Sequence, residues 1–400
     1  MKQAYIIDAV RSPIGRYSGV LSSVRPDDLA AHLIKSILHR NPEIDFKLIE
    51  DVLLGCTNQA GEDNRNIARM ALLLAGLPVD IGGVTINRLC ASGMQSVMDA
   101  SRAIMAGDGD VFIAGGVESM SRAPFVFPKS EYAFDRNVEI YDSTIGWRFP
   151  NKKLNDLYYP YSMGETAENV AEKWKISRER QDDFAFNSQQ KYKSAFNNGK
   201  FKDEIIPVPA QLKNEETIIV DKDEHPRLDT TKEKLANLKP AFRKNGTVTA
   251  GNSSGINDGA SVLLIVSEKI IQKHGLKPLA KVKAMAVAGI DPAFMGIGPV
   301  PATKKALSRA SININDLDLI EMNEAFASQS IACIQELKLD DNKVNVNGGA
   351  IALGHPLGCT GARIITTLLW EMNRRENVKT GLATMCVGVG QGASMIFEKV

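Results

Sequence analysis

The chain has 400 residues and a mass of 43.6 kDa, which is long for one small domain and sufficient for two or three. Its 48 Lys and Arg residues nearly balance 47 Asp and Glu, and a net charge of +1 creates no field that would recruit nucleic acid or an anionic membrane. Five cysteines, an odd number on a long chain, argue against a disulfide scaffold, and no Cys-x-x-Cys or His-x-x-x-His pair offers a metal site. These features predict a cytoplasmic enzyme with no metal, membrane or nucleic-acid partner.

The first 120 residues alternate the patterns of strands and helices. Short apolar runs predict strands, which we expect at 5–10, 52–55, 84–89 and 111–116. Amphipathic spacing and terminating Gly or Pro residues predict helices, which we expect at 27–39, 67–74 and 91–106. Continuous apolar strands that alternate with helices indicate parallel β-α-β units covered on both faces.

From about 121 to 250 the composition changes, and aromatic, Lys and Asp residues replace the apolar runs. This stretch holds one long polar helix, predicted at 178–197, and is interpreted as an excursion laid over the core. Further strands are predicted at 261–266, 281–288, 317–322, 382–387 and 395–397. The turn at 90–93 and the turn at 358–361 each open a helix, which fits either a duplicated α/β half or chance recurrence of a common turn.

The segment Asn-Arg-Leu-Cys-Ala-Ser-Gly-Met at 87–94 places Cys90 where a strand ends and a helix begins. A thiol at a helix N-terminus faces unpaired N–H groups and the positive end of the dipole, and both favour the thiolate. The small residues beside it leave room for a substrate and an amide free to bind an oxyanion. This pattern indicates a nucleophile, and a buried cysteine that only fills space is the alternative.

A glycine-rich segment at 345–358 indicates tight turns or close approach of a ligand. Its single histidine, His355, is followed by Pro356 and suits a rigid general base, although it could instead satisfy backbone groups of the loop. The other histidines lie on polar helix faces or in charged loops and are predicted to be solvated, namely His32, His39, His225 and His274.

Two more segments carry candidate chemistry. Cys386 closes an apolar strand and meets a glycine turn containing Gly388, a context that suits a second cysteine for proton transfer. Asn323 follows a strand just before a helix, where its amide could face a bound water or a carbonyl, or could simply cap the helix. The sequence around the remaining cysteines, Cys56, Cys333 and Cys359, gives weaker evidence for a catalytic role. Cys333 is expected in the core.

Taken together and in this order, these segments resemble the thiolase family strongly. The matching stretches span essentially the whole chain and lie at 87–93, 115–121, 249–255, 323–326, 354–356 and the glycines after Cys386. The resemblance implies an α/β thiolase fold, with two similar βαβαβαββ halves in five α-β-α-β-α layers and an inserted loop domain. The implied divisions are an N-terminal half at 1–121 plus about 250–270, a loop domain over the CoA site at 122–249 and a C-terminal half at 271–400.

Within this family the chain is most similar to the degradative branch. Segment 354–361 resembles 3-oxoacyl-CoA thiolases, and segments 55–66 and 144–149 resemble 3-oxoadipyl-CoA (β-ketoadipyl-CoA) thiolases of aromatic-compound breakdown. Biosynthetic acetoacetyl-CoA thiolases usually carry a histidine where this chain has Ser162, which disfavours a short-chain substrate. The implied reaction is thiolysis of a 3-oxoacyl-CoA with ping-pong kinetics, and acetoacetyl-CoA or general fatty 3-ketoacyl-CoA thiolases are the alternatives within the family.

The resemblance also implies roles for individual residues. Cys90 would accept the acyl group, His355 would activate it, and Cys386 would protonate the departing acetyl-CoA carbanion. One oxyanion hole would use His355 and a water held by Asn323, and the other would use the backbone N–H groups of Cys90 and Gly388. CoA is implied as co-substrate, without a permanently bound cofactor, and its expected contacts are Arg227 near the adenine, Phe242, Ala250 and Ser254 along the pantetheine, and Met163 and Phe326 at the acyl end.

A 3-oxoadipyl chain ends in a carboxylate, which needs a cation if its pocket is closed. Arg148 and Arg65 lie in the two subfamily-specific segments and are the candidates, Arg148 before Arg65, with a surface or interface salt bridge as the alternative for each. The family further implies a homodimer or homotetramer, with 123–138 as a candidate interface loop.

Three other classes share part of this residue set. A Cys-His-Asn thioester hydrolase could use Cys90, His355 and Asn323 but would not need Cys386. A ketosynthase normally uses two histidines where this chain offers His355 and Cys386. A non-catalytic CoA-ester binder would need none of these four side chains.

Overall fold

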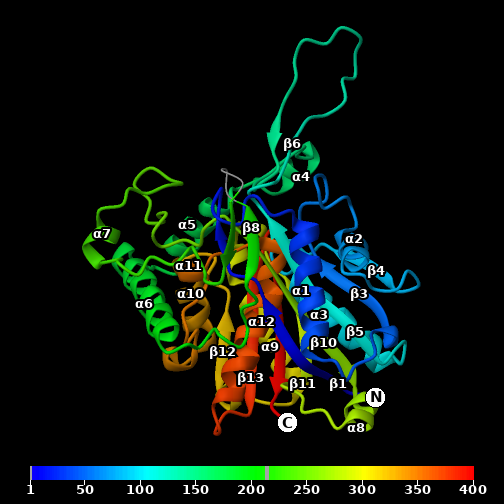
Figure 1. Cartoon of the computed structure of the whole chain (residues 1–400). Coiled ribbons are helices and arrows are strands. Elements are labelled where there is room, and N and C mark those ends of the chain that lie inside the picture. Colours follow the sequence, from blue (N-terminus) through cyan, green and yellow to red (C-terminus); the bar gives the residue numbers. More distant parts are fainter. Residues whose placement is uncertain (1, 212–215) are drawn as a thin grey trace.

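We describe residues 2–211 and 216–400 of the computed structural model (Figure 1). Its core consists of two halves. The elements of the first half are β1 (Ala4–Arg11), α1 (Pro26–Arg40), β3 (Ile49–Gly55), α2 (Ile67–Leu74), β4 (Gly82–Ile86), α3 (Ser92–Ala106), β5 (Val111–Ser119) and β10 (Asn257–Ser267). Those of the second half are β11 (Ala280–Gly289), α9 (Pro299–Ala310), β12 (Leu319–Met322), α10 (Ala327–Leu337), α12 (Leu357–Arg374), β13 (Thr380–Val387) and β14 (Gln391–Glu398).

The two halves arrange their strands in the same order. The first sheet runs β1-β10-β5-β3-β4 and the second runs β11-β14-β13-β12. In each sheet the last strand along the chain, β10 or β14, is antiparallel to both of its neighbours. Two residue pairs between β1 and β11 join the sheets at their edges. The repeated order confirms the predicted duplication of an α/β half.

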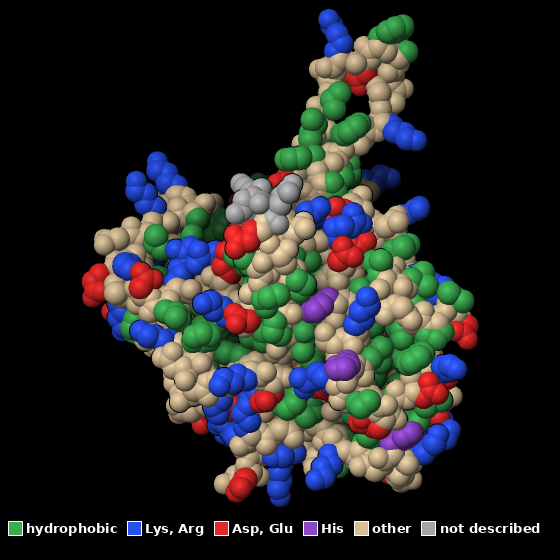
Figure 2. Space-filling view, in the orientation of Figure 1, with side chains coloured by type: hydrophobic (Ala, Val, Ile, Leu, Met, Phe, Trp, Pro, Cys, Tyr) green, Lys and Arg blue, Asp and Glu red, His purple; other side chains and the backbone are tan. Residues whose placement is uncertain are grey.

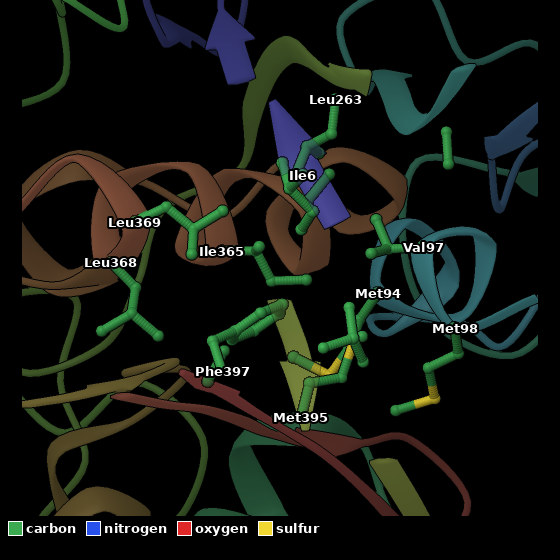
Figure 3. Close-up of a cluster of buried hydrophobic side chains, with 14 of the residues drawn as sticks. Ile6, Met94, Val97, Met98, Leu263, Ile365, Leu368, Leu369, Met395 and Phe397 are labelled. Atoms are coloured by element: carbon green, nitrogen blue, oxygen red, sulfur yellow. The ribbon is translucent and has the colours of Figure 1, made fainter. Parts of the chain in front are cut away.

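Helices α3 and α12 form the layer between the sheets. In Figure 3, Met94 of α3 and Ile365 of α12 lie between Ile6 of the first sheet and Met395 and Phe397 of the second. Helices α1 and α2 cover the outer face of the first sheet, and α9 and α10 cover the outer face of the second. These packings produce the five predicted layers, in which every apolar helix face is buried against a sheet.

Several strands differ in their bounds from the prediction: β14 begins at Gln391, β10 begins at Asn257, and β12 begins at Leu319. Two further differences affect the sheets. The strand expected at 84–89 ends at Ile86, because Asn87 accepts a hydrogen bond from the Leu89 N–H at 2.9 Å and turns the chain. In the second half, the place of β4 is taken by a single bridge between Ile320 and Val344. The described part of the second sheet therefore has four strands, one fewer than the βαβαβαββ pattern implies.

The excursion is inserted between the neighbouring strands β5 and β10. Its elements are β6 (Phe125–Val126), β7 (Tyr141–Asp142), α4 (Lys152–Leu157), α5 (Met163–Lys173), α6 (Arg178–Asn197), β8 (Val208–Gln211), β9 (Thr217–Val220) and α7 (Lys232–Ala236). Strands β6 and β7 form the base of a long ribbon that projects from the body at the top of Figure 1. None of the helices described is both long and apolar enough to cross a membrane.

Candidate active site

Glycines bring the turn that carries Cys90 against the loop that carries His355. A Cβ atom on Gly93 would lie 2.6 Å from the carbonyl oxygen of Gly358, and one on Gly116 would overlap the same oxygen. Any side chain at these positions would push the start of α12 away from α3 and β5. The structure thus brings two segments together that are 265 positions apart, the difference between 355 and 90.

A buried carboxylate reinforces this contact. Glu118, at the end of β5, accepts hydrogen bonds from the backbone N–H groups of Gly358 at 2.7 Å, Thr57 at 2.9 Å and Asn58 at 3.0 Å. Because buried polar groups are costly without partners, this carboxylate holds the His355 loop and the loop after β3 in one arrangement.

The turn before α3 is strained. Leu89 has a φ of 46°, in the left-handed region that non-glycine residues rarely adopt. Ser92 stabilises the turn, because its Oγ accepts from the Arg88 N–H at 2.9 Å and donates to the Leu89 carbonyl at 2.6 Å. The strain presents the Cys90 side chain at the N-terminus of the helix.

Burial opposes the thiolate form that the helix N-terminus favours at Cys90. Burial raises the pKa of the Cys90 thiol to about 11, and a hydrogen bond from the Gly388 N–H only partly opposes this effect. Loss of hydration therefore outweighs the helix N-terminus, and Cys90 is a thiol at neutral pH. A nucleophilic role for Cys90 requires a base.

Cys386 is the neighbour of Cys90 at the end of β13. Its pKa is raised well above the ordinary value, first by burial and then by the repulsion it would meet from Cys90 once that sulfur is ionised. Cys386 lies in one apolar cluster with Met163 and Phe326, the two residues predicted at the acyl end. This thiol keeps its proton until a strong base, such as a carbanion, forms beside it.

His355 is held as a neutral base with a defined tautomer. Its Nδ1 lies 2.7 Å from the Oγ1 of Thr360, and that hydroxyl donates its own hydrogen to the Pro356 carbonyl at 2.8 Å. Nδ1 must therefore carry the ring hydrogen, which leaves Nε2 as the acceptor nitrogen of the ring. Burial, followed by the charge of Arg363, lowers the pKa of His355 to about 3, so the ring is neutral at physiological pH.

Asn323 lies next to this base and does not cap a helix. Its Nδ2 is 3.4 Å from His355 Nε2, and the N-cap of α10 is Phe326. The capping interpretation of Asn323 is therefore wrong. The amide and the imidazole together present N–H donors and one acceptor nitrogen at the same place.

A cavity in the excursion contains two of the predicted CoA contacts. Arg227 and Ala250 line it together with Lys234, Ser253 and His225. Ser253 forms a backbone bridge with Phe326, which connects this cavity to the apolar cluster around Cys386.

The remaining predicted CoA contacts lie beside the same cluster. The rings of Phe242 and Phe326 meet edge to face at 6.2 Å, and the Ser254 N–H donates to the Ala325 carbonyl at 3.0 Å. A Cβ on Gly388 would lie 3.7 Å from the sulfur of Met163. The residues predicted to bind CoA therefore form a continuous row from the cavity to the thiols.

Three of the four histidines predicted to be solvated are partly buried. Only His39 is exposed, whereas His32, His225 and His274 are half-buried. The largest departure is His225, whose Nδ1 is covered and whose pKa is lowered to about 4 by burial and by the charges of Arg227 and Arg16.

The two segments with subfamily-specific sequence meet in space. Arg148 is half-buried and donates from Nη1 to the Ser143 carbonyl at 3.1 Å. Asn58 donates to the hydroxyl of Ser143 at 3.0 Å. Arg65 is exposed, with a φ of 63°. Arg148 is thus the more enclosed of the two candidate cations.

Sequence reasoning missed the residues that hold His355. Thr360 fixes its tautomer, and the Oδ1 of Asn257 accepts its backbone N–H at 3.0 Å. Thr360 lies five residues after the histidine within a segment that already stood out, so its hydroxyl was the available signal. Asn257 is about 100 positions away from His355, and no signal in the sequence connected the two.

Among the residues described, no group of three or more His, Cys, Asp or Glu side chains could hold a metal ion.

Comparison with known proteins identifies the family of this chain. Residues 4–269 match the family described as Thiolase, N-terminal domain, and residues 276–399 match Thiolase, C-terminal domain. The 3-oxoadipyl-CoA/3-oxo-5,6-dehydrosuberyl-CoA thiolase of Escherichia coli K12 is 56% identical, and a beta-ketoadipyl-CoA thiolase of Pseudomonas aeruginosa is 54% identical, each with full coverage of both chains.

Solved structures show the same fold. Human mitochondrial 3-ketoacyl-CoA thiolase in complex with CoA superposes with a TM-score of 0.91 at 40% identity, covering 100% of this chain and 98% of that one. The acetyl-CoA acetyltransferase of Bacillus anthracis gives 0.94 at 42% identity, with 100% and 99% coverage. The chain belongs to the thiolase family and is an acyltransferase.

Thr360→Val should lower kcat/KM about tenfold or more, because valine keeps the shape but offers no acceptor for the Nδ1 hydrogen, and the base can then adopt the wrong tautomer. Thr360→Ser is the matched control and should retain most activity. Steady-state thiolysis by both variants tests this role, and equal activity of the valine and serine variants would contradict it.

Proposed function

We propose that this enzyme cleaves 3-oxoadipyl-CoA with a second CoA, giving acetyl-CoA and a four-carbon dicarboxylic acyl-CoA. The observation that carries the chemistry is a neutral imidazole whose Nε2 lies next to Asn323, on a loop that packs against the turn of Cys90. The names of the relatives at 51–56% identity and the two subfamily-specific segments support the substrate.

In the first half-reaction, His355 Nε2 takes the Cys90 proton as the sulfur attacks the 3-oxo carbon. The developing oxyanion would be stabilised by one of the two donor pairs assigned above. The bond between C2 and C3 then breaks, the acyl group stays on Cys90 as a thioester, and the Cys386 thiol protonates the acetyl-CoA carbanion. The raised pKa of Cys386 suits this step, because the thiol is protonated when the carbanion forms.

In the second half-reaction, the thiol of a new CoA molecule attacks the thioester on Cys90. The proton of that thiol returns to the Cys386 sulfur, and the proton held by His355 returns to Cys90 as it leaves. Both side chains are then restored, and no oxidant, metal or external proton is consumed. The order of events gives ping-pong kinetics, as predicted from the sequence.

The two thiols favour this reaction over the other classes. A Cys-His-Asn hydrolase has no use for Cys386, whose side chain is 1% exposed and lies in the acyl-end cluster. A thioester at Cys90 and an acid at Cys386 can exist at the same time, as carbon–carbon cleavage requires. All five cysteines are free, which also supports an enzyme of the reducing cytoplasm.

CoA is proposed to enter as co-substrate along the row of residues from Arg227 to Phe326. Arg227 and Ala250 line the outer cavity, and Phe242 and Met163 approach the apolar cluster at its inner end. The basic side chains of Arg227 and Lys234 at the outer end suit the phosphates of CoA.

Cys90→Ser should abolish thiolysis and acyl-enzyme formation while CoA binding is retained, because serine is a much weaker acyl acceptor in this site. Cys386→Ser provides the contrast, since it should still form a labelled acetyl-enzyme from acetyl-CoA but should not cleave a carbon–carbon bond. Labelled acyl-enzyme on the Cys90→Ser protein would refute the assignment.

Arg148 is proposed to bind the distal carboxylate of the substrate. It is half-buried, and among the described residues its guanidinium donates only to the Ser143 carbonyl, so most of its donors are available. Ser162, where acetoacetyl-CoA thiolases usually have histidine, instead caps α5 together with Glu165. This arrangement supports a substrate longer than acetoacetyl-CoA.

Arg148→Ala should lower kcat/KM for 3-oxoadipyl-CoA by about 10- to 100-fold and leave 3-oxohexanoyl-CoA nearly unchanged, since only the first carries a charge to pair. Arg65→Ala is the comparison, and a larger effect there would transfer the role to Arg65. If neither variant changes the preference, both assignments fail.

The projecting ribbon is proposed as the contact that turns dimers into a tetramer. Its exposed side chains are unusually apolar for a monomer surface, as Figure 2 shows, and Phe134 is fully exposed.

The double variant Phe127→Ser with Phe134→Ser should lower the mass in solution from that of a tetramer to that of a dimer. Phe46 is an exposed aromatic residue outside the ribbon, and Phe46→Ser should leave the mass unchanged. Light scattering after size exclusion decides, and an unchanged mass would exclude the ribbon.

A further inference from the structure

Buried polar atoms without hydrogen-bond partners occur on both sides of the contact between β12 and α12. Arg363, on α12, is 1% exposed, and its Nε, Nη1 and Nη2 have no hydrogen-bond partner among the residues described. Across from it, the Oε2 of Glu321 and the Oδ1 of Asn323 also lack partners, and these residues are 3% and 0% exposed. Unpaired buried groups are rare, and each requires an explanation.

The three side chains lie near the proposed base. Glu321 and Asn323 are two positions apart in extended chain, so they face the same way. Arg363 follows Thr360 by three positions on α12 and therefore lies on the same side of the helix as the residue that holds His355. Its charge acts on both His355 and Glu321.

Their hydrogen-bonding capacities are complementary. Arg363 offers only donors, and Glu321, whose pKa burial raises to about 8, also has a hydrogen to donate at neutral pH. Asn323 Oδ1 is an acceptor. The Arg363 nitrogens lie more than 4.0 Å from the Glu321 carboxylate oxygens. Water can bridge polar groups at such a separation.

We propose that Arg363 and protonated Glu321 donate hydrogen bonds through buried water to Asn323 Oδ1. This polarity turns the amide so that its NH2 group faces His355 Nε2 and the reacting oxygen. Arg363 and Glu321 are then positioning residues, which act through Asn323 and do not touch the substrate. The inference rests on the proposed function of Asn323.

A pH dependence follows from the state of Glu321. The charged groups that act on it are Arg363 and Glu371 from α12, Glu324 from the segment after β12, and Glu204 from the loop before β8. When Glu321 loses its proton it becomes an acceptor and competes with Asn323 for the hydrogens of Arg363 and the water. The rate should therefore fall as the pH rises through about 8.

The test is the pH profile of kcat in Glu321→Gln. The kcat of the wild type should fall about tenfold above pH 8, and we call this fall the alkaline limb of the profile. It is a part of the roughly 10²- to 10³-fold that one oxyanion donor contributes to the rate. The glutamine variant keeps an N–H donor at every pH and should lack this limb. Glu371→Gln is the control: it should keep the limb and shift it to lower pH, because a neighbouring negative charge is removed. A limb that persists unchanged in Glu321→Gln overturns the proposal.

Two further variants separate this inference from the function it rests on. Arg363→Met should lower kcat more than tenfold with little change in KM for CoA, and Arg363→Lys should recover part of the loss. Asn323→Ala should be impaired at every pH. If Asn323→Ala is fully active, the proposed role of Asn323 fails; if it is impaired while Glu321→Gln keeps the limb, only the inference about Glu321 and Arg363 fails.

Discussion

The chemistry of this enzyme depends on the removal of water from its reacting groups. Burial lowers the pKa of His355 and raises the pKa of Cys90 and Cys386. The resting site is therefore uncharged, with two thiols as proton donors and one imidazole as acceptor. In a buried site, a proton moves between these groups only when a charge develops nearby. The order of the proposed proton transfers therefore depends on the exclusion of water as well as on the residues.

Because water is excluded from the site, the orientation of each polar side chain determines which atom can donate or accept a proton. An imidazole can act as a base only at the nitrogen without a hydrogen, and the Thr360 hydroxyl selects Nε2 for that role. Asn323 must in turn direct its NH2 group toward this nitrogen. Each group has its orientation set by a hydrogen bond on its far side, and the unpaired donors of Arg363 extend that principle one residue further.

The duplicated architecture explains why the residues converge. Cys90 precedes α3 and His355 precedes α12, and these two helices are the equivalent members that pack together in the central layer. Their N-termini meet where Gly93 and Gly358 allow close contact. The excursion between β5 and β10 then adds what the repeat lacks, the cavity proposed to admit CoA and an apolar ribbon.

Local signals in the sequence determined much of the fold and named the central residues. Helices α2 and α6 begin and end where predicted, because helix ends depend on nearby Gly, Pro and capping residues. Cys90, His355, Asn323 and Cys386 each stood at a strand end or turn, and short segments suffice to reveal such contexts.

Tertiary structure alone decided the ionisation of these groups and their partners. The helix N-terminus that favours a thiolate at Cys90 is visible in the sequence, whereas the burial that raises the pKa of this thiol is not. The covered ring of His225, the missing β4 equivalent and the unpaired guanidinium of Arg363 likewise depend on segments far apart in the chain. Hydration is a property of the whole packed molecule, and no local pattern of residues records it.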